Sequence, residues 1–265
     1  MTFQTRRVVA AGLALLLAGP AAAQDAGEDW DLVQRHDAIS ASIAFDSGLA
    51  VAVRCDDGSL ETYIAGLALP RERDIQRTVA YAFGDRPMRD STWQNSEDGH
   101  ALFADLPAPL ARRFRSGGDL QLRIAAHGDA PARRYVVSLP PSPAAIDRVL
   151  TTCGRPTVDP RDVLRANDSS TDPSSLDGPG PGWARQPRPS YPDRALEAGI
   201  SGMAVLSCMV EDDGRTKDCQ VEVERPAGAD FGREALRAAR DARLKPRPSG
   251  GGLVTFTIRF SIPGR

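Results

Sequence analysis

The feature that most constrains this fold is a short turn near the C-terminus, Asp213-Gly214, which separates two runs rich in apolar and β-branched residues. An Asp-Gly pair between two such runs is a strong signal for a β-hairpin. If these two residues form the turn, counting outward places Cys208 opposite Cys219, and a four-residue loop over 212–215 gives the same register. Directly opposed Cα atoms lie within the distance that a disulfide requires. The sequence therefore predicts a hairpin and a covalent bond across it.

The first 23 residues have the three parts of a secretory signal peptide. Two arginines precede the apolar run 8–23, and the run ends in small alanines before a polar residue. The run contains Pro20 and is shorter than the roughly 20 apolar residues that a membrane-spanning helix needs. We therefore predict export to the periplasm with cleavage after Ala23. A retained N-terminal anchor is the alternative.

Cysteine usage fits an exported chain, because an even number of cysteines in an oxidising compartment favours disulfides. The chain has 4 cysteines, so the pairing of Cys208 with Cys219 leaves Cys55 to pair with Cys153. The second bond would close a long loop and stabilise the fold by about 4–5 kcal/mol in the chain-entropy model. Buried free thiols are the alternative. The chain has no C-x-x-C spacing and its histidines are isolated, so we expect no metal site.

Composition and motifs argue against several classes of function. A formal net charge of -2 gives no reason to expect nucleic-acid binding. The spacings typical of serine hydrolases, zinc proteases, phosphate-binding loops and EF-hands do not occur. The acidic pairs Asp56-Asp57 and Asp212-Asp213 each precede a glycine in a predicted hairpin, where a solvated turn is a simpler interpretation than acid–base chemistry. We therefore expect a non-enzymatic protein without a cofactor.

Residues 25–153 have the pattern of a β-rich domain. Alternating polar and apolar residues bounded by turn-forming residues predict strands over 48–55, 59–67, 78–84, 119–126 and 134–140. Two short helices are expected, near 108–115 and over 142–152, the second with Ser142 as its cap and Pro143 in its first turn. Cys153 ends the second helix, so its bond to Cys55 would pin that helix on the first hairpin.

Residues 154–186 differ from both flanks, because they are rich in Pro, Gly and Ser and have no apolar periodicity. This composition is typical of a flexible linker. Prolines interrupt the glycine-rich run 178–182 and remove backbone donors, so the run is not a phosphate-binding loop. We therefore expect this segment to join two domains, 25–153 and 187–265.

From residue 187 onward the pattern becomes regular again, in the order helix, strand, strand, helix, strand. Pro192 and Gly199 mark the start and the end of the first helix. The second helix begins near Asp230, and Pro246 ends it. The last strand, over 254–263, alternates apolar and polar residues. A three-stranded antiparallel sheet packed under two helices buries these apolar faces, so we expect an α+β fold.

This order of elements and its motifs resemble the C-terminal domain of the TonB family. The matching motifs are Tyr191-Pro192, Ala195-Leu196, Gly199, Gly202, Asp213-Gly214-Arg215, Ala235-Leu236, Arg243-Leu244-x-Pro246 and Ile262-Pro263. The resemblance covers residues 187–265 and extends to no earlier part of the chain. It implies a domain that adds a receptor peptide to one of its strand edges, in a family that transmits inner-membrane energy to outer-membrane transporters.

Two features depart from that family. Its members keep an uncleaved membrane anchor followed by a long Pro-rich spanner, whereas here the N-terminal segment is predicted to be cleaved and the Pro-rich segment joins two domains. We therefore expect a periplasmic protein that binds an envelope partner, such as the periplasmic peptide of an outer-membrane transporter. The alternatives are an energy transducer with a retained anchor and a structural accessory protein of the envelope. A homodimer is possible, and pairing of the final strand within one would favour the structural role, because it would leave no free edge.

The final strand is the expected site of partner binding. Its main chain would form hydrogen bonds with an added strand, while exposed Thr255, Thr257 and Arg259 would provide specificity. The predicted partner-binding residues are Val254, Thr255, Phe256, Thr257, Ile258, Arg259, Phe260 and Ser261.

Overall fold

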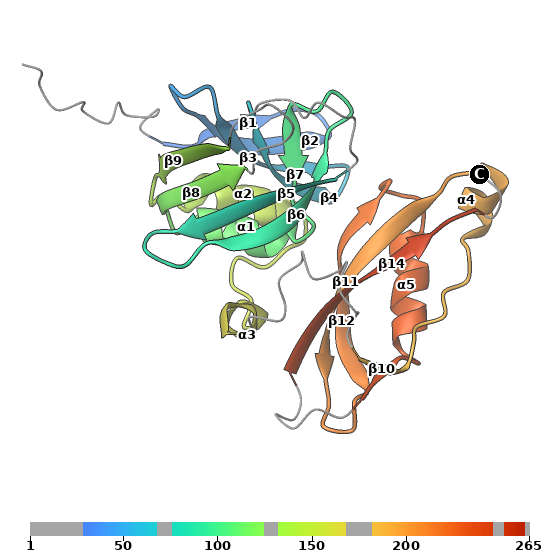
Figure 1. Cartoon of the computed structure of the whole chain (residues 1–265). Coiled ribbons are helices and arrows are strands. Elements are labelled where there is room, and N and C mark those ends of the chain that lie inside the picture. The colour runs from blue at the N-terminus through green and yellow to red at the C-terminus, as the bar shows by residue number, and fades with distance from the viewer. Residues whose placement is uncertain (1–28, 68–75, 125–131, 168–181, 246–251, 263–265) are drawn as a thin grey trace, which may run out of the picture.

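Figure 1 shows the computed structural model of the chain, which describes residues 29–67, 76–124, 132–167, 182–245 and 252–262. The predicted signal peptide with its cleavage point after Ala23, and residues 168–181 of the predicted linker, lie outside these ranges. The described elements form two groups, one on each side of the segment that contains helix α3 (Figure 1).

The first group is built on a nine-stranded antiparallel sheet with the strand order β1-β2-β3-β4-β7-β6-β5-β8-β9. All five strands that the sequence pattern predicts in this region are present, and β1, β2, β6 and β7 are additional. The strands are β1 (Asp31–Gln34), β2 (Ala38–Ala44), β3 (Ala50–Asp56), β4 (Ser59–Ala65), β5 (Gln76–Phe83), β6 (Arg89–Asn95), β7 (Ala101–Phe103), β8 (Gly118–Ile124) and β9 (Arg133–Leu139).

Helices α1 (Pro107–Phe114) and α2 (Ala144–Thr152) pack against this sheet and against each other. Their apolar side chains enter one continuous core, in which Phe114, Ile146 and Leu150 are fully buried. The Cys55–Cys153 disulfide joins β3 to the residue that follows α2, with a Cα–Cα distance of 5.5 Å. This bond pins α2 on the first hairpin, as the cysteine spacing predicts.

The predicted cap of α2 is wrong. Pro143 is the residue at the N-cap position, and no side chain caps this helix. The hydroxyl of Ser142 instead donates a hydrogen bond to the carboxylate of Asp29 at 3.0 Å, 113 residues earlier in the chain. A tertiary hydrogen bond has therefore replaced the expected helix cap, because a serine hydroxyl can donate to any acceptor within reach.

The interpretation of residues 154–186 as a flexible coil is wrong for their described part. Residues 161–167 form helix α3 (Arg161–Asn167), and residues 183–185 form strand β10 (Trp183–Arg185). The carboxylate of Asp159 accepts a hydrogen bond from the amide of Arg161 at 3.0 Å and so organises the first turn of α3. Polar contacts hold this segment in place. Such contacts produce no apolar periodicity in the sequence. The domain boundaries themselves remain a prediction.

The second group has the predicted architecture of a three-stranded antiparallel sheet with two helices, but the predicted end of the second helix at Pro246 is wrong, because α5 ends at Ala239 and strand β13 occupies Arg243–Leu244. The sheet has the order β12-β11-β14. Side chains of β11 and β14 pack under α5, where the ring of Phe260 lies 4.6 Å from that of Phe231. Strand β10 pairs with the short strand β13 as a separate two-stranded sheet. The elements are α4 (Asp193–Glu197), β11 (Gly202–Val210), β12 (Thr216–Arg225), α5 (Phe231–Ala239), β13 (Arg243–Leu244) and β14 (Gly252–Phe260).

The turn between β11 and β12 is longer than predicted. The amide of Glu211 donates to the carbonyl of Arg215 at 2.9 Å, so residues 211–215 form the loop and Val210 faces Thr216. Next to the loop the register is therefore one residue away from the predicted one. The pair Asp213-Gly214 therefore marks the position of the turn without fixing its length.

An irregularity in β12 restores the predicted register further along the hairpin. Asp218 has a φ of 49° and lies where the pairing shifts by one residue, so that Ser207 faces Gln220. An extra residue of this kind is a β-bulge. Beyond it Cys208 and Cys219 come together with a Cα–Cα distance of 4.0 Å and form the predicted disulfide.

Gly214 allows a close approach of two backbones and gives a test of this arrangement. A Cβ at this position would lie 2.1 Å from the carbonyl oxygen of Leu244, and its φ is +85°. Gly228 has a similar φ of +73° with no atom within 4 Å of a built Cβ. We expect Gly214→Ala to lower the free energy of unfolding by about 3 kcal/mol, since overpacking adds to the cost of a left-handed residue.

The matched variant Gly228→Ala is expected to lose only the conformational part, about 1 kcal/mol. Urea unfolding of both variants measures the two free energies. Equal losses would contradict the close approach of Gly214 to β13.

Candidate functional site

Strand β14 forms one edge of the C-terminal sheet. It pairs with β11 over its full length, from Gly202 opposite Phe260 to Val210 opposite Gly252. Among the described residues, no other strand pairs with it. An edge strand of this length presents unpaired amides and carbonyls that can bind a further strand. The strand predicted over 254–263 is thus present, although it begins at Gly252 and ends at Phe260, so that Ser261 lies just beyond its end.

The two faces of β14 have different neighbours. Val254, Phe256, Ile258 and Phe260 are buried in the core under α5. The residues on the reverse face were predicted to be exposed, and this is correct only for Arg259, because Thr255 and Thr257 are partly buried. Other parts of the chain therefore cover the reverse face of the sheet at these two positions.

Part of that cover comes from residues that follow β7. Leu106 forms a small buried cluster with Met203, Val205 and Val223 on the reverse face of the C-terminal sheet. Beside it, the guanidinium of Arg225 donates to the carboxylate of Asp105 at 2.7 Å and to the carbonyl of Ala104 at 3.0 Å. An apolar contact bordered by a paired charge is a typical interface between packed units.

Burial controls the electrostatics of this ion pair. It raises the pKa of the Asp105 carboxyl, and the nearby charge of Arg225 opposes the rise without cancelling it. Burial likewise lowers the pKa of Arg225, against the attraction of Asp105. Separating Asp105 from Arg225 inside the protein would leave two buried charges without partners. The pair therefore stabilises the contact between these two parts of the chain.

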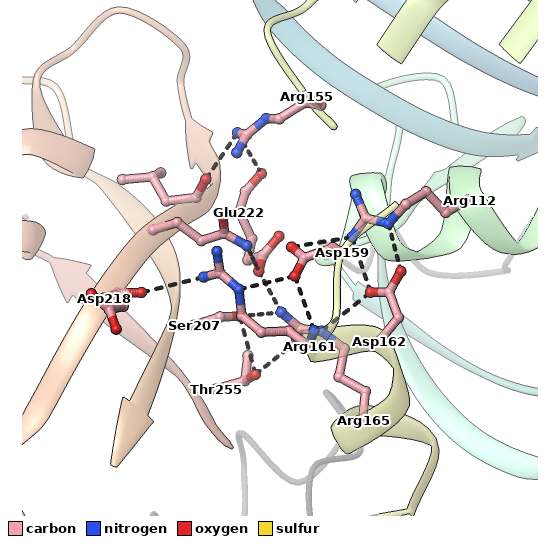
Figure 2. A network of polar contacts seen from close by, with 12 residues as sticks. Arg112, Arg155, Asp159, Arg161, Asp162, Arg165, Ser207, Asp218, Glu222 and Thr255 are labelled. Atoms are coloured by element: carbon pink, nitrogen blue, oxygen red, sulfur yellow. Dashed lines mark hydrogen bonds and ion pairs between the residues drawn. The ribbon is translucent and has the colours of Figure 1, made fainter. Parts of the chain in front are cut away.

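Helix α3 also covers part of this face, through Arg165 (Figure 2). Its guanidinium donates to the hydroxyl of Ser207 on β11 at 2.6 Å and to that of Thr255 on β14 at 3.0 Å. The same group forms an ion pair with Glu222 on β12 at 2.5 Å. Arg165, in the segment 154–186 that connects the two groups, thus contacts all three strands of the C-terminal sheet.

Glu222 is placed for this contact by a second bulge in β12. Val205 faces Val223 whereas Leu206 faces Val221, so Glu222 is the extra residue in the pairing. The residue is only 1% exposed, and Gln220 donates to the same carboxylate oxygen at 3.0 Å. Bulges often redirect a side chain in this way. A buried carboxylate needs a paired cation, and here Arg165 provides it.

The other end of α3 is held by helix α1. Arg112 forms an ion pair with Asp162 on α3, and its guanidinium also lies 3.7 Å from the carboxylate of Asp159. Burial opposes the ionisation of Asp159, but the amide and guanidinium of Arg161, together with Arg112, lower the pKa of this carboxyl below its usual value. Charged pairs therefore connect α1, through α3, to the C-terminal sheet (Figure 2).

Sequence reasoning missed Arg165 and Glu222. Arg165 lies in the segment whose composition predicted a linker, and Glu222 lies in β12, in which Lys217 and Asp218 are exposed and the other polar residues are buried or partly buried. The one available signal was Glu222 itself, a carboxylate between Val221 and Val223 in the predicted strand that begins at Cys219. Such a position calls for a buried partner, but the sequence does not reveal which cation supplies it.

The remaining candidates from the sequence do not come together as a reactive site. Asp57 lies in a turn, and Asp213 pairs with Arg243 at 2.7 Å on the surface. Within the described ranges, no group of three His, Cys, Asp or Glu side chains could hold a metal ion. In the same part of the chain, no helix has both the length and the apolar character that crossing a membrane requires.

Comparison with known proteins concerns the C-terminal part of the chain. Residues 187–262 match the family described as the Gram-negative bacterial TonB protein C-terminal. Among solved structures, the chain is similar to the solution NMR structure of the Pseudomonas aeruginosa TonB C-terminal domain. The two share 32% identity over 31% of this chain and 87% of that one, with a TM-score of 0.28. No curated protein matches the chain.

Proposed function

Because residues 187–262 belong to the TonB C-terminal family, we propose that this protein is a non-enzymatic periplasmic binding protein of the cell envelope. Its partner would be an extended peptide of an envelope protein, and the periplasmic peptide of an outer-membrane transporter fits the family. The peptide would add to the C-terminal sheet as a further strand. Two disulfides in the chain support an exported protein, since such bonds persist in oxidising compartments.

The observation that carries this proposal is the edge of β14, which pairs with β11 on one side. Strand addition needs main-chain donors and acceptors in a row, and affinity comes mainly from those hydrogen bonds. The core under α5 and the contacts of Arg165 hold the strand flat from both faces. A preorganised edge loses little conformational entropy when a peptide binds, which favours binding.

Arg259 is the side chain best placed to select among peptides, because it is exposed while Thr255 and Thr257 are partly buried. A cation at this position favours a peptide with an acidic residue on the same face as Arg259. Cross-strand pairs of opposite charge typically contribute about 0.2–1 kcal/mol. Main-chain pairing would thus supply most of the affinity, and Arg259 a modest preference.

A structural accessory role is the second candidate, and the covered reverse face favours it. Leu106, Asp105 and Arg165 all use the C-terminal sheet as a docking surface within the chain. In that case the sheet would be a scaffold, and recovery of partners would not depend on the edge of β14. An energy transducer would require a retained anchor within the first 28 residues, which lie outside the described ranges.

A proline in β14 distinguishes strand addition from the scaffold role. We expect Thr257→Pro to lower recovery of outer-membrane transporters from an envelope extract by at least about tenfold, because it removes one main-chain donor and bends the edge. The measurement is quantitative mass spectrometry after capture on the immobilised full chain. Arg259→Glu, which leaves the main chain intact, is expected to change recovery only about two- to fivefold.

The matched control is Lys217→Pro on β12, an exposed residue in the strand at the opposite edge of the sheet. It should leave recovery unchanged, and thermal unfolding should show that both proline variants remain folded. Equal recovery by Thr257→Pro and the unmodified chain, or recovery of transporters by neither, would refute strand addition at β14.

A further inference from the structure

A cleft of about 690 Å³ lies among β5, β6, α1 and the segment 157–165, away from the edge of β14. Its volume falls within the range of about 300–1,000 Å³ that is usual for small-molecule sites. The cleft walls combine aromatic rings from the nine-stranded sheet with side chains of α1 and α3. Arg165 lines the cleft and also contacts Thr255 on β14, but no residue of β14 itself lines the cleft.

The charge of the lining is strongly asymmetric. Six arginines and three aspartates line the cleft, and each of the three aspartates is already paired with an arginine. Asp105 pairs with Arg225, while Asp159 and Asp162 both pair with Arg112. The surplus of positive charge therefore lies on arginines that these carboxylates do not neutralise.

Three of the lining arginines have no carboxylate within ion-pair distance among the described residues. Arg112, Arg115 and Arg165 pair with acidic residues, but Arg86, Arg89 and Arg113 do not. Arg86 and Arg89 are exposed, and Arg113 is partly buried. Clustered guanidiniums repel one another, so an anion bound between them would be stabilised.

Arg113 shows most directly the lack of a partner for a positive charge. Its guanidinium lies over the ring of Phe83, 4.4 Å from the ring centroid. Its Nε is buried, and no partner for it occurs among the described residues. Burial lowers the pKa of Arg113, and the charge of Arg86 lowers it further. A buried donor without an acceptor is costly, and a bound anion would supply the acceptor.

Aromatic and aliphatic side chains line another part of the cleft. Trp93 is only 2% exposed, and its indole nitrogen is a second buried donor without a partner among the described residues. Tyr81 lies edge-on to the same ring at 6.1 Å. Val158 and Val163, which also line the cleft, are unusually exposed for their type, at 73% and 63%. These surfaces could be covered by the apolar body of a ligand.

We propose that this cleft binds a small amphipathic organic anion. One carboxylate or sulfonate would be held by the guanidiniums of Arg86 and Arg113. An aromatic or short aliphatic body would lie between Trp93 and the two exposed valines. Guanidiniums bind such oxyanions in a bidentate geometry, which sets the orientation of the ligand.

Binding of 8-anilinonaphthalene-1-sulfonate to the folded full chain tests this site, with N-phenyl-1-naphthylamine as a neutral probe of similar shape. We expect the double variant Arg86→Gln/Arg113→Met to weaken binding of the sulfonate at least about tenfold, because two charged hydrogen-bonding groups are lost. Binding of the neutral probe should change less than about twofold. The methionine keeps an apolar side chain over Phe83.

Two further variants keep the test decisive. Val163→Asp, at an exposed wall position, should weaken sulfonate binding severalfold by adding a negative charge. Arg188→Gln/Arg194→Gln, at exposed positions in the C-terminal part, should leave it unchanged. Unchanged sulfonate binding in the first double variant would overturn the proposal. Equal loss of both probes would also overturn it, because the cleft would then be selective for apolar surface alone.

Discussion

Arg165→Met is expected to lower the free energy of unfolding by about 3–5 kcal/mol, because it leaves the carboxylate of Glu222 buried without a cation. The side chain of Glu222 is 0% exposed and that of Arg165 is 10% exposed, so solvent screens their interaction little. The variant also removes the donors to Ser207 and Thr255. Urea unfolding of the full chain measures the loss.

A double-mutant cycle separates the ion pair from the fold around it. Arg165→Met/Glu222→Gln should recover most of the loss, since a neutral amide costs much less to bury than an unpaired charge. The matched control is Arg233→Met on α5, whose pair with Asp230 has side chains 63% and 35% exposed. Exposed pairs contribute about 0–1 kcal/mol. A loss from Arg165→Met no larger than that of the control would contradict the docking of α3.

The elements that sequence reasoning found are those in which a local pattern and the tertiary structure agree. The alternation in 254–260 is retained because one face of β14 is buried under α5, which fixes the register. Gly214 and the cysteine spacing also constrain geometry locally, and the structure keeps both disulfide pairs. Such signals can be recognised without knowledge of the rest of the chain.

The elements that were missed depend on distant partners. Strand β6 contains Arg89, Ser91 and Gln94, so its sequence lacks a clear alternation, and its pairing with β5 and β7 places it in the sheet. Helix α3 lacks an apolar stripe, because charged contacts with α1 and the C-terminal sheet hold it. A sequence pattern shows which residues are buried at regular intervals. Ion pairs between residues 50 or more positions apart produce no such regular pattern in the sequence.

The strand that forms the candidate site was predicted from the sequence, but the exposure of its side chains was predicted only in part. The notion of three exposed specificity residues assumed a reverse face open to solvent. Leu106 and Arg165 cover part of that face, which leaves Arg259 exposed. Contacts between the two parts of the chain decide exposure, and neither part alone contains that information.

Cys55→Ala/Cys153→Ala is expected to lower the free energy of unfolding by about 4–5 kcal/mol, because the bond closes a long loop in the unfolded chain. The sequence separation is 98 residues. For Cys208→Ala/Cys219→Ala the separation is 11 residues, and the same chain-entropy relation gives about 3 kcal/mol. Urea unfolding of both variants under oxidising conditions compares the two bonds directly.

The long-range bond should also affect the contacts of α3. Cys153 is the residue from which the connecting segment starts, and Asp159 anchors the same segment to Arg112 six residues later. Loss of the bond frees that start, so hydrogen exchange of the α3 amides should accelerate in Cys55→Ala/Cys153→Ala and remain unchanged in the hairpin variant. A larger loss of stability in the hairpin variant would show that packing around Cys208, which is fully buried, outweighs chain entropy. Unchanged exchange in both variants would mean that the charged contacts alone hold α3 against the sheet.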